Sequence, residues 1–281
     1  GKLLGIPATV VMPKYAPLIK IGNCEKLGAN VVLHGKDFSE AKEKAHEIAK
    51  ERGLAYIDGY DDPAIIAGQG TMGLEILDQV PDVDAVVVPV GGGGLLAGVA
   101  LAVKSLRPQT KVIAVEADHV ASFSAAIQAG KPVRINMQPT LADGLAIAQV
   151  GANAFATAAP LVDRIVVVSE EQIAISVLRI LELEKGVVEG AAATPLAACL
   201  SGQLPELAGK RVVLLLCGGN IDPNVMSRVI ERGLVADGRL ARFTAIISDR
   251  PGGLADLAAK IASAGASIKQ VVHDRAFADA D

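Results

Sequence analysis

Short runs of β-branched and other apolar residues alternate along this chain with stretches whose apolar residues recur at helical spacing. This alternation is typical of βαβ units on a parallel sheet. It predicts an α/β fold with open parallel sheets. The runs that predict strands are Ala8 to Met12, Asn30 to Leu33, Ala85 to Pro89, Lys111 to Val115, Arg164 to Val168 and Arg211 to Leu216.

Local signals place several helices between these strands. Residues 37–52 carry apolar side chains on one face and charges on the other. Pro63 follows two aspartates, and proline suits the first turn of a helix. Ser169 and Gln172 precede an apolar periodic run and predict a capping box, so a helix is expected to start there.

The pattern changes near Val235. An alternating run from Leu240 to Ser248 predicts a strand, residues 249–254 read Asp-Arg-Pro-Gly-Gly-Leu, and a short helix is expected to run through Ala264. A second strand is expected from Ser267 to His273. We therefore expect the start of a separate β-α-β module of a different kind.

Composition and charge narrow the function classes. The 281 residues are long enough for one large or two ordinary domains, 51% of them are hydrophobic, and the formal net charge is −4 with both signs interspersed. This balance does not indicate a nucleic-acid partner, and the longest apolar stretches are too short for a membrane span. The three cysteines are widely separated and odd in number, which favours a reducing compartment, the cytoplasm.

The two ends of the sequence interrupt predicted elements. Gly1 opens onto what resembles the tail of a helix, and Asp281 follows closely on a predicted strand. We expect a chain cut at both ends, so that a missing signal peptide carries no information.

The strongest local signal for chemistry is Gly91-Gly92-Gly93-Gly94-Leu95, between a buried strand and an apolar helix. Backbone N–H groups and the helix N-terminus would converge there without intervening side chains, a geometry that binds phosphate. A glycine turn used only for tight strand-to-helix packing is the simpler alternative.

The same segment also matches a dinucleotide-binding fingerprint. Gly92, Gly94 and Ala97 have the spacing G-x-G-x-x-A, and Glu116 ends the next predicted strand. An NAD-binding site is therefore a second interpretation, although the motif follows several earlier βα units instead of opening the domain.

A second glycine cluster follows another buried strand, at Cys217-Gly218-Gly219-Asn220. In open α/β sheets, ligands bind beyond the carboxyl ends of the strands, so two such clusters can contact two ends of one ligand. Cys217 could offer a weak hydrogen bond to a heterocyclic nitrogen, or it could be a small buried apolar residue.

Three further stretches complete the candidate site. Residues 66–71 place two costly glycines in a helical context, which predicts a close backbone approach. Residues 140–144 (Thr-Leu-Ala-Asp-Gly) lie in a loop, and Glu189 precedes an Ala-rich helix, where it could simply stabilise the helix dipole. No HExxH or G-x-S-x-G motif supports a zinc or hydrolase site.

In order and spacing, VVPVGGGGLLAG, IAGQGT, TLADG, VVEGAAA and LLCGGN resemble the fold-type II pyridoxal-phosphate enzymes, specifically threonine dehydratases (threonine ammonia-lyases) and their serine dehydratase and serine racemase relatives. The resemblance covers Gly1 to about Val235. It implies a two-lobed, tryptophan-synthase-β-like α/β fold, with residues 1–60 in a small lobe and 61–236 in a large cofactor-binding lobe. Residues 239–281 are similar to the opening of an α+β ACT regulatory module.

The resemblance also implies roles for individual residues. Gly91, Gly92, Gly93, Gly94 and the amide of Leu95 match the cup for the cofactor phosphate, and Cys217 matches the position facing the pyridine nitrogen. Gly144 and Glu189 match positions that line the ring.

Two other features of the family are not assigned to this chain. The relatives' divalent-metal site begins with the carboxylate that matches Glu116, but its third ligand aligns with Ser122, so we predict no metal. The Schiff-base lysine and the asparagine that meets the cofactor lie in motifs expected upstream of Gly1. We therefore assign no catalytic residue to this chain.

The resemblance implies elimination of threonine, and of serine as well, to 2-oxobutanoate or pyruvate and ammonia. It further implies a cytoplasmic homo-oligomer in isoleucine biosynthesis, regulated by an amino-acid or nucleotide effector. A serine dehydratase or racemase on the same scaffold and a non-catalytic amino-acid-binding protein stay open as alternatives.

Overall fold

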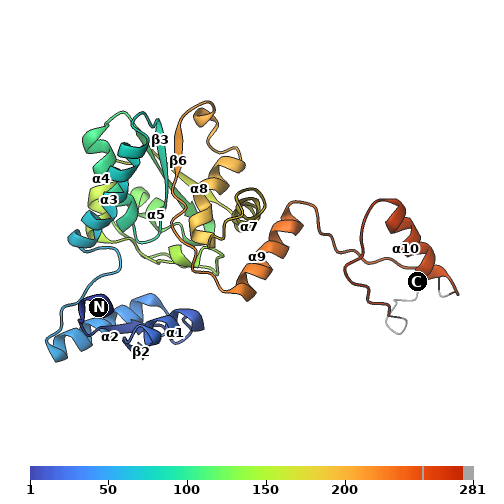
Figure 1. Cartoon of the computed structure of the whole chain (residues 1–281), viewed down its shortest axis with the longest axis horizontal. Coiled ribbons are helices and arrows are strands. Elements are labelled where there is room, and N and C mark those ends of the chain that lie inside the picture. The colour runs from blue at the N-terminus through green and yellow to red at the C-terminus, as the bar shows by residue number, and fades with distance from the viewer. Residues whose placement is uncertain (249, 275–281) are drawn as a thin grey trace. The chain divides into compact units, whose positions relative to one another are not determined.

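A four-stranded parallel sheet forms the centre of the larger part of the molecule (Figure 1). The structure is a computed structural model, and it describes residues 1–248 and 250–274. The strands are β3 (Ala85–Pro89), β4 (Lys111–Ala117), β5 (Arg164–Val168) and β6 (Val212–Leu214), in the spatial order β5-β4-β3-β6. Every side chain of β3 is buried, as expected for the middle of a parallel sheet.

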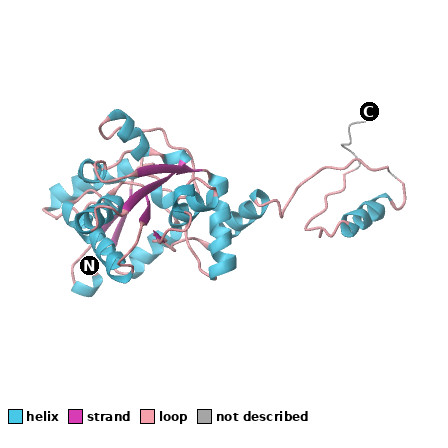
Figure 2. Ribbon diagram, turned by 90° about the horizontal axis from the view of Figure 1, so that it is seen from above, coloured by secondary structure: helices cyan, strands magenta, loops and turns pink. Residues whose placement is uncertain are grey.

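Helices cover both faces of this sheet (Figure 2). One face packs against α3 (Pro63–Gln79), α4 (Gly94–Leu106), α5 (Ser122–Ala129) and α6 (Ala152–Ala158). The other packs against α8 (Gly190–Leu200), and α7 (Glu170–Arg179) and α9 (Pro223–Ala236) share a further apolar cluster with α8. A π-helical turn, Ile180–Glu184, continues α7. No helix within the described ranges is long and apolar enough to cross a membrane.

The helices α3 and α4 cross at a point where neither has a side chain. A Cβ atom on Gly98 would overlap the carbonyl oxygen of Ile66, and one on Gly70 would lie 3.1 Å from the carbonyl oxygen of Gly98. The close approach predicted from residues 66–71 is therefore confirmed at Gly70. A Cβ atom on Gly68 would have no neighbour within 4 Å, so only one of the two glycines serves the contact.

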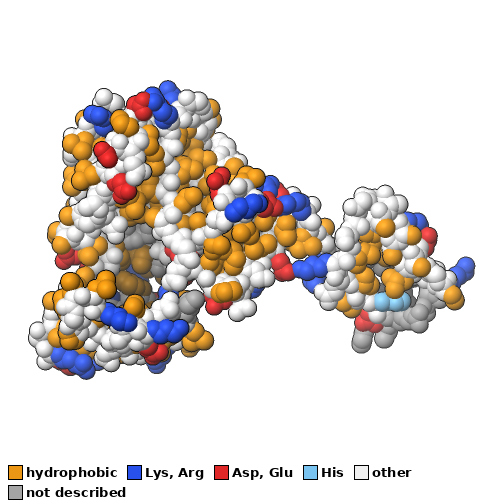
Figure 3. All heavy atoms as spheres, in the orientation of Figure 1, with side chains coloured by type: hydrophobic (Ala, Val, Ile, Leu, Met, Phe, Trp, Pro, Cys, Tyr) orange, Lys and Arg blue, Asp and Glu red, His pale blue; other side chains and the backbone are white. Residues whose placement is uncertain are grey.

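A small lobe precedes the large one in the chain and is drawn in blue in Figure 1. Its parallel strands β1 (Thr9–Met12) and β2 (Asn30–Leu33) pack with α1 (Leu18–Lys26) and α2 (Phe38–Arg52). Two ion pairs join the lobes: Lys20 Nζ lies 3.1 Å from Asp143 Oδ2, and Arg134 Nη2 lies 3.1 Å from Asp37 Oδ2. The face shown in Figure 3 is hollowed between the two lobes.

Most of the predicted elements are confirmed. All the strands predicted before residue 220 are present, with ends that differ by up to two residues. Asp37 caps α2, Pro63 is the first residue of α3, and Ser169 and Gln172 form the predicted capping box at the start of α7. The helices α1, α5 and α6 were not predicted.

The second unit of the chain begins at Ala241. Its helix α10 (Gly253–Ser263) agrees with the prediction, but the strands predicted at 240–248 and 267–273 are wrong: the described residues of both segments form no ladder. A strand is stable only when a neighbour takes up its backbone hydrogen bonds. The side chains of these segments are correspondingly open, with Ile246 91% and Val272 82% exposed. Asp249 and residues 275–281 lie outside the described residues.

Candidate active site

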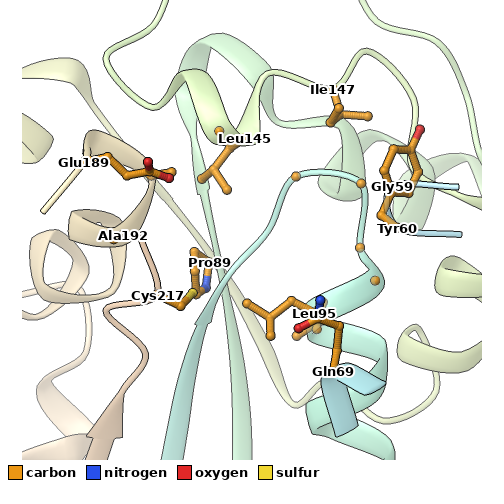
Figure 4. Close-up of a pocket in the computed structure, with 17 residues that line it drawn as sticks. Gly59, Tyr60, Gln69, Pro89, Leu95, Leu145, Ile147, Glu189, Ala192 and Cys217 are labelled. Carbon is orange, nitrogen blue, oxygen red and sulfur yellow. The ribbon is translucent and has the colours of Figure 1, made fainter. Parts of the chain in front are cut away.

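A cavity of about 230 Å³ opens at the carboxyl ends of β3 and β6 (Figure 4). These strands are neighbours in the sheet, so the segments that follow them meet at one edge. All the predicted site residues line this cavity. They are Gly91, Gly92, Gly93, Gly94, Leu95, Gly144, Glu189 and Cys217.

The glycine segment forms one wall of the cavity and leads directly into α4. Gly93 is the N-cap residue of α4 and has φ 92°, a left-handed conformation that favours glycine. The first N–H groups of a helix have no partner within the helix, and they carry its positive end. This wall therefore offers backbone donors and a favourable field to an anionic group.

Cys217 forms part of the opposite wall. It lies three residues after β6, in a segment anchored where the Leu215 N–H donates to the Val87 carbonyl oxygen at 3.1 Å. Partial desolvation and the nearby charge of Glu189 raise the pKa of the Cys217 thiol. The thiol is therefore neutral at physiological pH and presents a weak, uncharged donor to the cavity.

Glu189 also faces the cavity and is the N-cap residue of α8, but its side chain makes no cap hydrogen bond. A Cβ atom on Gly144 would lie 2.9 Å from its Oε1 atom, so the two residues are in close contact. Desolvation and the charge of Asp143 raise the pKa of the Glu189 carboxyl, while Lys20 acts in the opposite direction. Glu189 therefore presents a partly desolvated carboxyl to the cavity from the N-terminus of α8.

Gly144 reaches the cavity on the short 3-10 turn Asp143–Leu145. Its neighbour Asp143 forms the ion pair with Lys20 of the small lobe. The loop that was predicted to carry Gly144 thus meets both lobes at the edge of the cavity.

Several lining residues were missed. Tyr60 and Gln69 reach the cavity from the segment before α3 and from α3 itself, and Ile147 follows the Gly144 turn (Figure 4). Desolvation, followed by the charges of Asp58 and Asp61, raises the pKa of Tyr60 to about 12. The sequence signal that could have identified Tyr60 is that it is an aromatic residue in a chain with only 3% aromatics. The other lining residues not predicted are Gly59, Pro89, Leu96, Leu145, Ala191 and Ala192.

Glu116 does not line the cavity. Its carboxylate is buried and accepts hydrogen bonds from the Phe123 N–H at 2.6 Å, the Ser124 N–H at 2.8 Å and the Ser124 hydroxyl at 2.5 Å. The NAD interpretation needs this carboxylate free to meet a ribose. Both oxygens already accept hydrogen bonds from the first turn of α5, so the NAD interpretation has no free carboxylate at this position. Ser122 is also buried, and its hydroxyl has no partner among the described residues.

Asp118, His119 and Glu170 place their ligand atoms within 4.8 Å of one another. Both oxygens of Glu170, however, already accept hydrogen bonds from Thr140 and Leu141. The group therefore belongs to the support of the loop that carries Gly144.

Comparison with protein families agrees with the resemblance in the motifs. The family model described as pyridoxal-phosphate dependent enzyme matches residues 1–218. An L-threonine ammonia-lyase of Thermotoga maritima is 45% identical over 275 residues, which are 98% of this chain and 68% of that protein.

Solved structures with the same architecture include two with clear sequence similarity. The processed form of threonine deaminase isoform 2 from Solanum lycopersicum superposes with a TM-score of 0.77 at 38% identity, covering 83% of this chain and 68% of that one. A serine racemase from Dictyostelium discoideum gives a TM-score of 0.72 at 31% identity, covering 79% and 71%.

Proposed function

The chain belongs to the pyridoxal-phosphate-dependent enzyme family, and from this premise we propose that it converts L-threonine to 2-oxobutanoate and ammonia. The α-proton and the β-hydroxyl leave threonine as water. A water molecule is taken up again when the amino group is released as ammonia, so the atoms balance. Nearly the whole chain is similar to an L-threonine ammonia-lyase, and this observation carries the choice of substrate.

The cavity fits a cofactor with a phosphate at one end and a heterocycle at the other. The wall Gly91–Gly94 offers the N-terminus of α4 and no side chains, which suits a phosphate. Cys217, Glu189 and Gly144 line the part of the cavity where the ring would lie. When bound, pyridoxal phosphate supplies an electron sink for the α-carbon of an amino acid.

Cys217 sets the electronic character of that site in our proposal. A neutral thiol with a raised pKa cannot hold a proton on a ring nitrogen as a carboxylate would. The electron sink is then moderate, which favours loss of a β-hydroxyl over reactions that need a long-lived carbanion.

The product distribution tests the function directly. The product of the complete gene, supplied with pyridoxal phosphate, is expected to form 2-oxobutanoate from L-threonine faster than pyruvate from L-serine. A Cys217→Asp variant is expected to shift the products toward racemised amino acid, whereas Cys217→Ser should not. Absence of 2-oxobutanoate from the wild-type protein would contradict the proposal.

The phosphate site has a test of its own. Leu95→Pro removes one backbone N–H in the first turn of α4, where the N–H groups have no partner within the helix. A hydrogen bond to a charged group contributes about 1.5–3 kcal/mol, so the Kd for pyridoxal phosphate is expected to rise roughly 10- to 100-fold. Leu95→Ala keeps the N–H and is the control. Equal Kd values for the two variants would rule out this amide as a phosphate ligand.

A serine-directed enzyme is the second candidate, because a serine racemase shares the fold at 31% identity. Threonine and serine differ by one methyl group, which contributes only about 1–3 kcal/mol of discrimination in a pocket. Relative kcat/KM values for L-threonine and L-serine, with chiral analysis of recovered serine, separate the two.

We also propose that residues 239–281 belong to an ACT-like module that binds an amino-acid or nucleotide effector. The similarity to the Thermotoga maritima protein extends over 275 residues and so beyond the family match at 1–218, which supports a shared C-terminal segment. We further propose that the protein is a homo-oligomer and that it acts in the cytoplasm, in isoleucine biosynthesis. A shift of the threonine saturation curve by isoleucine or by a nucleotide is the expected readout.

A further inference from the structure

Glu170 is a buried carboxylate whose hydrogen bonds all serve one loop. The residue is 3% exposed and is the first residue of α7. Its Oε1 accepts from the Thr140 hydroxyl at 2.5 Å, and its Oε2 accepts from the Leu141 N–H at 2.7 Å. A buried charge is costly unless its oxygens are satisfied, and the positive end of α7 lowers that cost further. The loop therefore supplies the hydrogen bonds that compensate for the burial of this carboxylate.

The loop in question carries the residues that reach the cavity. The Thr140 hydroxyl also accepts from the Ala142 N–H at 3.0 Å, so one chain of hydrogen bonds runs from Glu170 to Ala142. The turn Asp143–Leu145 follows at once. Gly144 and Leu145 line the cavity, and Asp143 pairs with Lys20 of the small lobe.

Two further contacts hold the same segment from other sides. A Cβ atom on Gly190, the residue after Glu189, would overlap the Leu141 carbonyl oxygen, so the loop rests directly on the start of α8. On the preceding side, His119 Nδ1 lies 2.5 Å from the Pro139 carbonyl oxygen and 3.8 Å from Glu170 Oε1. Leu141 is thus fixed at its N–H by Glu170 and at its carbonyl by the backbone next to Glu189.

We infer that Glu170 is a positioning residue for this site: it holds the 140–144 loop so that Gly144 stays in contact with Glu189 and Asp143 with Lys20. Glu170 itself does not line the cavity and is not a catalytic residue. Its effect on turnover rests on the proposed function, whereas its effect on the loop does not.

Amide hydrogen exchange on the full-length protein without substrate tests the loop directly. Glu170→Gln keeps the size of the side chain but removes its charge and one acceptor oxygen, so the charge-assisted hydrogen bonds to Thr140 and Leu141 are replaced by weaker neutral ones. Exchange of the amides at 141–147 is expected to accelerate about tenfold or more. Glu171→Gln is the matched control: Glu171 is the next residue of α7 but pairs with Arg232 at 2.8 Å, and its loss should change exchange in the loop less than twofold.

A second pair of variants guards against misfolding of the Glu170 variant. Thr140→Val removes the hydroxyl that links Glu170 to Ala142, and Thr140→Ser restores it. We expect faster loop exchange in the valine variant and wild-type exchange in the serine variant. Unchanged loop exchange in both Glu170→Gln and Thr140→Val would overturn the inference, as would an increase spread evenly over the large lobe.

Kinetics with threonine separate this inference from the proposed function. Thr140→Val is expected to lower kcat/KM about tenfold, with Thr140→Ser restoring it. A wild-type protein that makes no 2-oxobutanoate, in which Glu170→Gln still loosens the loop, would refute the function and keep the positioning role. If the wild type forms 2-oxobutanoate but loop exchange is unchanged in both variants, the proposed function is kept and the positioning role is refuted.

Discussion

The two parallel sheets of this chain have similar sequences but different environments. In the large lobe, β3 is buried along its whole length between layers of helices. In the small lobe, every residue of β1 is only partly buried. Parallel sheets are normally covered on both faces, and only the large lobe meets that condition in the described residues.

The difference assigns different tasks to the lobes. The large lobe supplies the fixed edge on which Gly91–Gly94 and Cys217 stand. The small lobe contributes Lys20 through an ion pair whose side chains are 35% and 50% exposed. We therefore regard the large lobe as the frame of the site and the small lobe as a more weakly attached part that contacts the edge of the site through Asp143.

The largest expected effect comes from breaking the frame at the α3–α4 crossing. Gly98→Ala forces a Cβ atom against the Ile66 carbonyl oxygen, which is backbone and can move only with its helix. We expect a loss of about 3 kcal/mol in the free energy of unfolding, measured by urea denaturation.

Gly68→Ala is the matched control for that substitution. Gly68 lies in α3 with open space around it, so alanine should stabilise the helix by up to about 1 kcal/mol. If both alanine variants changed stability equally, the crossing would not be the tight point of the large lobe.

Two valine truncations compare the lobes directly. Val87→Ala empties space in fully buried β3 and is expected to cost about 2–3 kcal/mol, because a cavity adds to the lost transfer free energy. Val11→Ala in partly buried β1 should cost about 1 kcal/mol or less. Equal losses in denaturant unfolding would mean that the small lobe has a core as tight as that of the large lobe.

The smallest effect concerns pH. The pKa of Asp58 is lowered: burial opposes this, but the hydrogen bond from Lys42 and those from the Tyr60 and Asp61 amides outweigh it. A lowered folded-state pKa stabilises the fold above the unfolded pKa, and this contribution is lost as the pH falls through the folded pKa. Lys42→Met should therefore reduce stability by less than about 1 kcal/mol at pH 7, and the difference should vanish in acid.

Glu116 in the large lobe changes the stability of the fold with pH in the opposite direction. Burial raises its pKa, although hydrogen bonds from Ser124 and Phe123 act against that. Ionisation of Glu116 then costs stability as the pH rises through the raised pKa.

Urea unfolding of the wild type and of Lys42→Met between pH 3 and pH 7 tests the contribution of Asp58 and Lys42. A difference in the free energy of unfolding that grows in acid would contradict that prediction.

Sequence reasoning succeeded where short-range patterns decide the structure. The β-branched runs of β3 and β4, the capping box at Ser169 and the glycine turn between β3 and α4 all depend on neighbours in the chain. It failed at residues 240–248, where alternation was present but no partner strand among the described residues takes up the hydrogen bonds.

Long-range contacts were beyond its reach for a different reason. Lys20 and Asp143 are separated by 123 residues, and nothing near either one marks the other as its partner. Tyr60 reaches the cavity because of how the segment before α3 crosses the glycine wall, which no local periodicity encodes. The glycine segment, Gly144, Glu189 and Cys217 could therefore be placed in one site from motifs, but the other residues at its rim and the contacts that support it could not.

Because two ion pairs join the lobes, ionic strength changes how firmly the small lobe is held against the large lobe. Lys20–Asp143 and Arg134–Asp37 are both partly exposed, so dissolved salt weakens them. At about 0.15 M salt the Debye length is about 8 Å, longer than either contact, so screening reduces the attraction without removing it. The small lobe is thus held against the large lobe by attractions that a dilute buffer strengthens and a concentrated electrolyte weakens.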